Sequence, residues 1–291
     1  MSQKSTPIKP IIKPYILVDT SYTSFYRFFA TIRWYSFAFA EEFKELKKDI
    51  NYDWSKNKIF IEKYEKMYLD SIIKLVTKKV FNNSIIIFCM DSPKEHLWRT
   101  ELQCDYKGDR ADLSLKYNFK TTFNYTYETM IPKLLAQSES MFNIRVDKME
   151  ADDIIAIICM HLKTHNSLQP IYLVSGDEDF LQLGRPNITF VNYKIKKPFV
   201  LDESEALKSL NKKFILGDSS DCIKSIFPKG KRVNKKEIME SESKLLEFLD
   251  MYPSAKIQYE FNKKMIDFKN IPNNYYKKVV KIFVKIFTKL N

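Results

Sequence analysis

The sequence contains few of the residues on which many catalytic and structural sites depend. It has three histidines, four cysteines and five glycines among 291 residues. His96, His161 and His165 lie outside the acidic motifs described below, so they form no Ser-His-Asp or Cys-His pattern of nucleophilic catalysis. The cysteines include no C-x-x-C pair, and Cys89 and Cys159 lie within apolar runs. We therefore expect free thiols in an intracellular, reducing compartment, without a zinc site.

Long hydrophobic runs are also absent. No segment approaches the roughly 18 consecutive apolar residues that a membrane span requires, so we expect no membrane partner. Residues 1–14 are polar, contain three prolines and lack the apolar centre of a signal peptide. We predict a flexible tail there.

The chain is strongly basic. Its formal net charge is +12 and its pI is near 9.2, although dense acidic motifs are also present. A basic surface around a local acidic site indicates a polyanionic partner. AT-rich coding, which favours lysine, is the alternative explanation of the charge.

Three apolar segments that we predict to be buried strands are each followed by aspartate. They are residues 15–18 before Asp19, 84–90 before Asp91, and 171–174 before Asp177 and Asp179. Segments that are apolar on both faces are typical of a parallel sheet with helices on each side. Because ligands bind at the carboxyl ends of parallel strands, these acids are candidates for one shared site.

A further group of acids opens the predicted helix that begins near Glu150. Glu150, Asp152 and Asp153 precede an apolar helical run. Acids gathered with those of the strand ends would repel each other unless a cation bound there, and a hard divalent metal is the natural candidate. The alternative is structural, because acids also stabilise helix N-termini and Asp177 and Asp179 could be turn or cap residues.

The order of the predicted elements indicates an α/β protein. Strands and helices alternate to about residue 201 and only helices follow, so we predict a core at 15–201 and a helical DNA-binding module at 202–291. The core would hold a central, mostly parallel, twisted sheet flanked by helices. Predicted helices are 22–48, 56–80, 127–142, 202–210 and the region from 235 onward; further strands are 143–149, at the sheet edge, and 187–192.

Basic and aromatic residues alternate between residues 99 and 125. The segment includes Arg99, Lys107, Arg110, Lys116 and Lys120, interleaved with tyrosines and phenylalanines. One interpretation is a nucleic-acid-facing segment, in which cations neutralise phosphates and rings stack on unpaired bases. The other is a solvated helix whose aromatic face is partly buried.

Six motifs occur in the same order as in a known family. They are LVDTSYTSFYR (17–27), FCMDSP (88–93), WRTELQCDYKGDR (98–110), MEADD (149–153), SGDEDFLQL (175–183) and GDSSDCI (217–223). In these the chain resembles the structure-specific 5′ nucleases, which are the flap endonucleases and 5′–3′ exonucleases of bacteria, phages and large DNA viruses. The resemblance implies a PIN-like fold with a helical arch at about 107–142.

The resemblance also implies roles for individual residues. Lys107 and Arg110 match catalytic cations beside the scissile phosphate. Arg99 matches a family arginine just upstream of these two cations. Tyr22 lies near the position where the family stacks an aromatic ring on the terminal base. The acids that match the family's metal ligands are Asp19, Asp91, Glu150, Asp152, Asp153, Asp177, Asp179, Asp218 and Asp221.

The implied reaction is phosphodiester hydrolysis assisted by two Mg²⁺ ions, with Mn²⁺ as a substitute. The implied substrate is DNA with a free 5′ end, a flap or a junction, and an RNA–DNA hybrid is an alternative. We expect the protein to act as a monomer in DNA replication or repair.

Two departures from the family pattern concern glycine. Thr20 replaces the glycine that usually follows the first aspartate, and residues 224–232 replace a glycine-rich run with one glycine, Gly230. Backbone amides of glycine-rich turns, which bind phosphate, are therefore scarce. We predict that basic side chains contact the duplex instead, and the candidates are Lys224, Lys229, Lys231 and Arg232. The alternative is that these four residues are ordinary solvated cations.

Three other functions compete with this interpretation. A non-cleaving module that binds branched nucleic acid would be expected to lack some of the acids, and none is missing. A PIN-type ribonuclease would be a shorter chain without an arch or a helical module. A phosphatase with an aspartyl nucleophile would require D-x-D after the first strand, whereas Asp19 is followed by Thr20 and Ser21.

Overall fold

The computed structural model describes residues 13–93, 96–108, 117–228, 230 and 232–290. The predicted tail lies almost wholly outside this range. Within it, five strands form a single sheet in the order β3-β2-β1-β4-β5, and every pair is parallel. The strands are β1 (Tyr15–Asp19), β2 (Ile85–Met90), β3 (Met141–Arg145), β4 (Ile171–Val174) and β5 (Ile188–Val191). The prediction of an α/β fold with a parallel sheet is confirmed.

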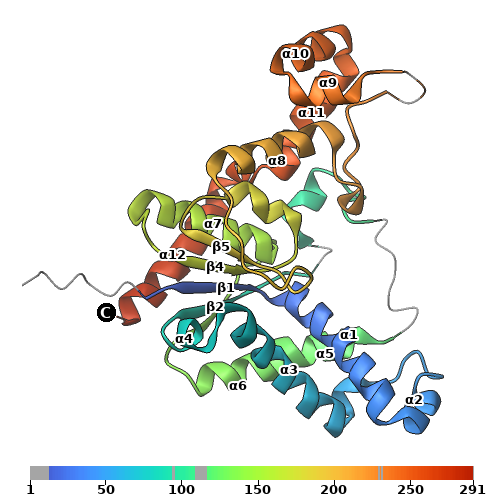
Figure 1. Ribbon diagram of the computed structural model, residues 1–291, viewed down its shortest axis with the longest axis vertical. Coiled ribbons are helices and arrows are strands. Elements are labelled where there is room, and N and C mark those ends of the chain that lie inside the picture. The colour runs from blue at the N-terminus through green and yellow to red at the C-terminus, as the bar shows by residue number, and fades with distance from the viewer. Residues whose placement is uncertain (1–12, 94–95, 109–116, 229, 231, 291) are drawn as a thin grey trace, which may run out of the picture.

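The central strand is β1, with β2 on one side and β4 on the other. In this register Leu17 lies opposite Ile87 and Leu173. Every residue of β1 and β2 is buried, because helices cover both faces of the sheet (Figure 1). The carboxyl ends of β1, β2 and β4 therefore lie next to each other.

The helices α1 to α6 lie on one side of the sheet, with α2 at the far end of α1 (Figure 1). They are α1 (Thr20–Ala38), α2 (Ala40–Leu46), α3 (Lys58–Val76), α4 (Lys78–Asn82), α5 (Phe119–Tyr125) and α6 (Ile131–Ala136). Two predicted helices are each divided, at Phe39 and at Thr77, and Thr77 has a left-handed φ of 75°. A short π-helical segment, Thr126–Met130, joins α5 to α6. The helix predicted at 127–142 ends at Ala136, because residues 141 and 142 already belong to β3.

The aromatic residues of the 99–125 segment are mainly core residues. Tyr106 is buried, while Tyr117 and Phe119 pack edge-to-face on Phe28 of α1. Such contacts favour the structural interpretation of these rings. Among the cations predicted there, Arg110 and Lys116 lie outside the described residues.

The other face of the sheet is covered by α7 (Ala151–His165) and α12 (Asn273–Leu290). Tyr275, Val279 and Phe283, spaced by four residues, form the buried face of α12. They belong to the same hydrophobic cluster as Tyr15 of β1. The end of the chain thus packs on the core, which the predicted division at residue 202 did not anticipate.

The remaining helices stand beyond this layer (Figure 1). They are α8 (Glu203–Leu216), α9 (Lys235–Glu240), α10 (Glu242–Met251) and α11 (Pro253–Ile266). A separate small cluster, which includes Ile226, Ile238 and Phe248, holds α9 and α10 against the end of α8. The helical character predicted for this region is confirmed.

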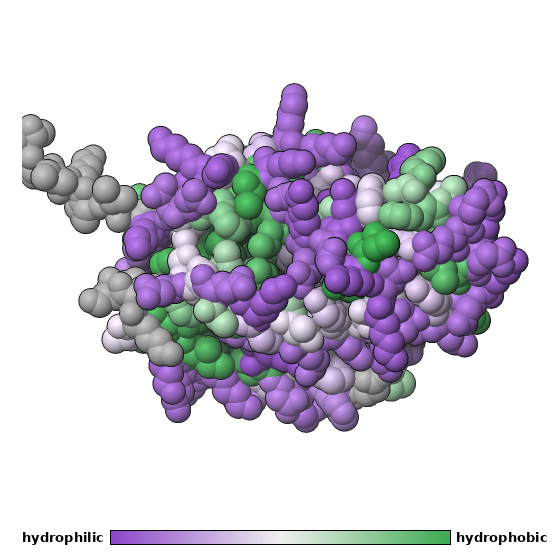
Figure 2. Space-filling view, turned by 90° about the horizontal axis from the view of Figure 1, so that it is seen from below, coloured by the Kyte–Doolittle hydropathy of each residue, from purple (hydrophilic) through white to green (hydrophobic). Residues whose placement is uncertain are grey.

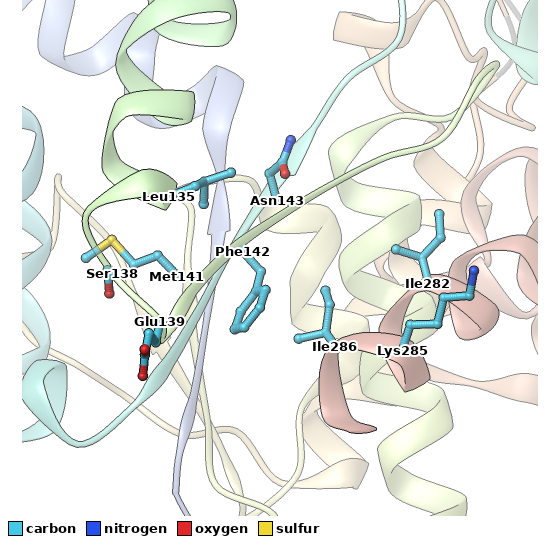
Figure 3. A pocket seen from close by; sticks show the side chains of 9 residues that line it. All are labelled: Leu135, Ser138, Glu139, Met141, Phe142, Asn143, Ile282, Lys285 and Ile286. Carbon is cyan, nitrogen blue, oxygen red and sulfur yellow. The ribbon is translucent and has the colours of Figure 1, made fainter. Parts of the chain in front are cut away.

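The edge strand β3 borders an apolar pocket of about 460 Å³. Figure 3 shows Phe142 pointing toward Ile286 of α12, while Met141 points to the opposite side, toward α6. The pocket flanks the amino-terminal half of β3, whereas the acidic motifs follow the carboxyl ends of the strands. It is therefore separate from the candidate site.

The surface seen from below is mostly hydrophilic, with apolar side chains showing in places (Figure 2). Within the described part of the chain, no helix combines the length and apolarity needed to cross a membrane. Cys89 and Cys159 are buried free thiols, as predicted.

Candidate active site

The start of α7 brings three carboxylates together. Glu150 is the N-cap of this helix, and Asp153 completes a capping box with it. One oxygen of each of Glu150, Asp152 and Asp153 lies within 4.8 Å of the others. Because Glu150 is 5% exposed and Asp153 is 0% exposed, their charges require nearby compensation.

Two cations provide part of this compensation. Arg99, in the short helix Trp98–Glu101, places Nη1 3.0 Å from Glu150 Oε2 and Nη2 2.8 Å from Asp153 Oδ1. Lys107 forms a further ion pair with Glu150. Burial alone would raise the pKa of Glu150, but the charges of Lys107 and Arg99 outweigh it and lower the pKa to about 2. Glu150 is therefore ionised at neutral pH.

The ends of β1 and β2 add two more acids. Asp19 caps α1 by accepting the Tyr22 backbone N–H at 3.0 Å, and it accepts the Ser175 hydroxyl at 2.9 Å. Asp91 accepts the backbone N–H of Ala151. The Asp19–Ser175 bond joins the ends of β1 and β4, and the Asp91–Ala151 bond joins the end of β2 to the start of α7. We call Asp19, Asp91, Glu150, Asp152 and Asp153 the first acid group.

Among the residues that the structure describes, only Arg99 and Lys107 form ion pairs with the five carboxylates of this group. Burial, followed by the charge of Asp91, raises the pKa of Asp19 to about 7. Burial also raises the pKa of Asp91. The pKa of Asp152 is raised well above its usual range by burial and by the charges of Glu150 and Asp153. Burial is the main cause of these raised pKa values, and repulsion between the carboxylates adds to it; a bound cation would offset both.

A second acid group consists of Asp177, Asp179, Asp218 and Asp221. Asp177 caps the short helix Glu178–Leu183, and its Oδ1 accepts the Asp179 backbone N–H at 2.9 Å. Lys213 of α8 forms ion pairs with Asp179 and with Asp218, the latter at 3.0 Å. Burial and the charge of Asp177 nevertheless raise the pKa of Asp179 to about 6.

Tyr106 connects the two acid groups. Its hydroxyl lies 3.1 Å from Glu150 Oε2 and 3.0 Å from Asp221 Oδ2. The backbone N–H of Lys107 also lies 3.4 Å from the carbonyl oxygen of Asp221. The acids from three strand ends, α7 and the turn after α8 therefore form one continuous site.

The nucleic-acid-binding candidates are placed differently. The Tyr22 ring stacks on Tyr26 and Tyr193, with ring centroids 6.2 and 5.9 Å away. The Tyr22 hydroxyl lies so close to Gly176 that any side chain at position 176 would overlap it. Arg99 is 3% exposed and is held by its two carboxylates. We therefore propose that Arg99 positions the acids and does not itself contact nucleic acid.

Two other candidates lie outside the two acid groups. Lys224 and Arg232 are exposed on the segment between α8 and α9. Arg110, Lys229 and Lys231 lie outside the described residues. No role was predicted for Lys213 from the sequence. Its position on the helix that leads to Asp218, five residues before that acid, is a signal that could have identified it.

Comparison with known proteins now decides the family. The model of the 5′–3′ exonuclease N-terminal resolvase-like domain matches residues 14–211. The chain belongs to this family. That membership confirms the predicted enzyme class, a phosphodiester hydrolase of the 5′–3′ exonuclease type.

Individual relatives agree with this assignment. The ribonuclease H of Enterobacteria phage T4 is 25% identical over 245 residues, which cover 78% of this chain and 79% of the relative. Two solved structures share the fold. The bacteriophage T5 flap endonuclease, in a pseudo-enzyme–product complex with DNA and metal ions, has a TM-score of 0.60 and 15% identity, covering 94% of this chain and 98% of that chain. The T5 5′-exonuclease with zinc ions has a TM-score of 0.58 and 17% identity, with the same coverage.

Proposed function

We propose that this chain is a divalent-metal-dependent 5′ nuclease that cleaves DNA near free 5′ ends or branched junctions. The observation that carries the proposal is the joining of two acid groups through Tyr106, with more carboxylates than ion-paired cations among the described residues. Oxygen donors around excess negative charge suit a hard divalent cation. We expect the protein to act as a monomer.

We infer that the two acid groups would hold two Mg²⁺ ions, for which Mn²⁺ would be a substitute. Glu150, Asp152, Asp177 and Asp179 would hold the metals most directly, and Asp19, Asp91, Asp218 and Asp221 would do so directly or through water. Bound divalent ions supply an activated water and stabilise the leaving oxygen. Asp153, which accepts the Trp98 indole N–H at 2.7 Å besides pairing with Arg99, would support Glu150 and Asp152.

Lys107 is placed to meet a phosphate at the first acid group. Its side chain is 12% exposed and ion-pairs with Glu150, so its ammonium lies beside the first acid group. A phosphate that gains negative charge in the transition state would be stabilised by this ammonium. Arg110, three residues later, would contribute in the same way.

A cleavage assay tests the proposal. The substrates are 5′-labelled flap, nicked and blunt DNA, and an RNA–DNA hybrid, each with Mg²⁺, with Mn²⁺ and with EDTA. We expect short products from the 5′ end or the junction with either metal and none with EDTA. Equal cleavage in EDTA would contradict the metal-dependent mechanism, and binding without cleavage would indicate a recognition module.

The substitution Lys107→Ala tests the role of the cation. We expect the single-turnover rate at saturating enzyme to fall by about 10²–10³, the usual cost of one transition-state contact, with a much smaller change in DNA affinity. Lys74→Ala is the matched control, because it removes an exposed lysine of α3 that has no proposed role. An unchanged rate in Lys107→Ala would show that Lys107 serves only to balance Glu150.

The salt dependence of DNA binding tests the segment between α8 and α9. Each phosphate contact on duplex DNA contributes about 0.9 to the slope of log affinity against log salt. We expect Lys224→Ala/Arg232→Ala to lose roughly two units of slope on a substrate with a long duplex arm. A bare single strand should show a much smaller loss.

The control for that measurement is Lys74→Ala/Lys78→Ala, which removes two exposed lysines from α3 and α4, on the other side of the sheet (Figure 1). An equal loss of slope in both double variants would mean that only the overall charge matters. No loss in Lys224→Ala/Arg232→Ala would place the duplex elsewhere on the protein.

A further inference from the structure

Lys213 holds an unusual position in the second acid group. It lies in the last turn of α8, and its ammonium ion-pairs with Asp179 and lies 3.0 Å from Asp218 Oδ2. These two carboxylates come from separate segments, the short helix after β4 and the turn after α8. The side chains of Lys213, Asp179 and Asp218 are only 17–19% exposed. The ammonium is thus enclosed among the acids.

The position of this ammonium matters because carboxylates bind one cation at the expense of another. Asp179 and Asp218 cannot keep short contacts with the Lys213 ammonium while the same oxygens surround a metal ion. A divalent ion in contact with the ammonium would also be strongly repelled, since like charges at about 4 Å interact by several kcal/mol near a protein surface. Metal binding to these two acids therefore requires Lys213 to move.

The side chain of Lys213 is suited to such a movement, in contrast to the cation of the first acid group. Arg99 is 3% exposed and is fixed by two carboxylates and by the Met265 carbonyl oxygen, 3.0 Å from its Nε. Lys213 is partly exposed and has an unbranched, flexible chain. Lys213 also lies just beyond residues 14–211, so the family match does not include it.

We propose that Lys213 is an internal counter-cation of the second acid group, which competes with a divalent ion for Asp179 and Asp218. This inference rests on the proposed function, because it takes the second acid group to be a metal site. In the metal-free protein Lys213 holds the short helix after β4 and the turn after α8 together. When a divalent ion binds, the ammonium leaves the carboxylates, so the affinity of this site for metal is lower than its acids alone would produce.

The test measures metal binding directly. Mn²⁺ is titrated by calorimetry into wild type, Lys213→Met and Lys212→Met, without DNA. Methionine keeps most of the length of lysine but carries no charge. Lys212 is the exposed neighbour on the same helix, so Lys212→Met controls for the loss of one positive charge. We expect one Mn²⁺ site of Lys213→Met to tighten by about tenfold or more, with little change in Lys212→Met.

Thermal unfolding supplies a second readout. In EDTA, Lys213→Met should have a lower Tm than wild type, because Asp179 and Asp218 lose their partner. Added Mn²⁺ should raise the Tm of Lys213→Met more than that of wild type, since tighter binding to the native state stabilises it more. The same Mn²⁺-induced increase in both proteins would overturn the proposal.

A charge-preserving variant keeps the proposal testable if Lys213→Met does not fold. The guanidinium of Lys213→Arg can pair with both carboxylates, so we expect its Mn²⁺ affinity at this site to equal or fall below that of wild type. Tighter Mn²⁺ binding by Lys213→Arg would contradict competition. If the wild type cleaves DNA with Mn²⁺ and Lys213→Met binds Mn²⁺ no more tightly than wild type, the inference fails and the proposed function stands.

Discussion

Replacing Asp177 with asparagine should lower the single-turnover rate of DNA cleavage by at least about 10²–10³, the cost of losing one contact that stabilises the transition state. Asp177 is an exposed member of the second acid group, and its carboxylate is a proposed metal ligand. An amide in its place carries no charge and binds a hard cation more weakly. DNA affinity should be retained or increase slightly, because one negative charge near the phosphates is removed.

The fold should tolerate this substitution. The structural role of Asp177 is to cap the short helix Glu178–Leu183, where its Oδ1 accepts the Asp179 backbone N–H at 2.9 Å. Asparagine caps helices about as well as aspartate. A loss of activity in Asp177→Asn would therefore report on chemistry, without a large contribution from misfolding.

The neighbouring acid provides the control. Glu178 is exposed, one residue away, and has no proposed role, so Glu178→Gln removes the same charge from the same turn. Both variants are compared on a 5′-labelled flap at saturating enzyme with Mg²⁺. Full activity of Asp177→Asn would remove Asp177 from the metal site, and an equal loss in Glu178→Gln would show a general charge effect.

The sheet and the first acid group were predictable because each leaves a local pattern. A strand that is apolar on both faces must be covered by helices, and parallel strands bring their carboxyl ends to one edge. These two rules are enough to predict that Asp19 and Asp91 lie at the same edge of the sheet. The hydrogen bond from the Ala151 backbone N–H to Asp91 joins the end of β2 directly to the start of α7.

Helix boundaries were less predictable. The helix predicted at 56–80 ends at Thr77, whose φ is 75°. Glycine commonly marks such a left-handed position, and a β-branched residue there is unusual. The sequence thus has no glycine stop signal at Thr77; instead the Thr77 hydroxyl caps α4 by accepting the Val80 backbone N–H at 3.4 Å.

Contacts between distant segments were not predictable from local patterns. The spacing of Tyr275, Val279 and Phe283 indicates an amphipathic helix but does not say which surface it covers; the structure places it on the sheet core. The burial of Arg99 depends likewise on α11, whose Met265 carbonyl accepts from its Nε. A cation beside an acidic motif is compatible with substrate binding and with charge compensation, and only the packing distinguishes them.

Replacing Arg99 with methionine should lower the free energy of unfolding by about 3–5 kcal/mol, the usual cost of leaving a buried charge without its partner. The guanidinium is 3% exposed and pairs with Glu150 and Asp153, which are also buried. Methionine fills a similar volume but leaves both carboxylates less compensated. The pKa of Glu150, which Lys107 and Arg99 hold near 2, should rise in the variant.

The measurement is urea unfolding in EDTA at neutral pH, compared with Arg33→Met as the control, because Arg33 is exposed on α1. Arg33→Met should change the free energy of unfolding by less than about 0.5 kcal/mol. The deficit of Arg99→Met should shrink at lower pH, where Glu150 with its raised pKa becomes protonated and no longer needs a cation. If the loss in the free energy of unfolding does not change with pH, it is due to packing. If there is no loss, the acids at the start of α7 do not depend on Arg99 for their charge balance.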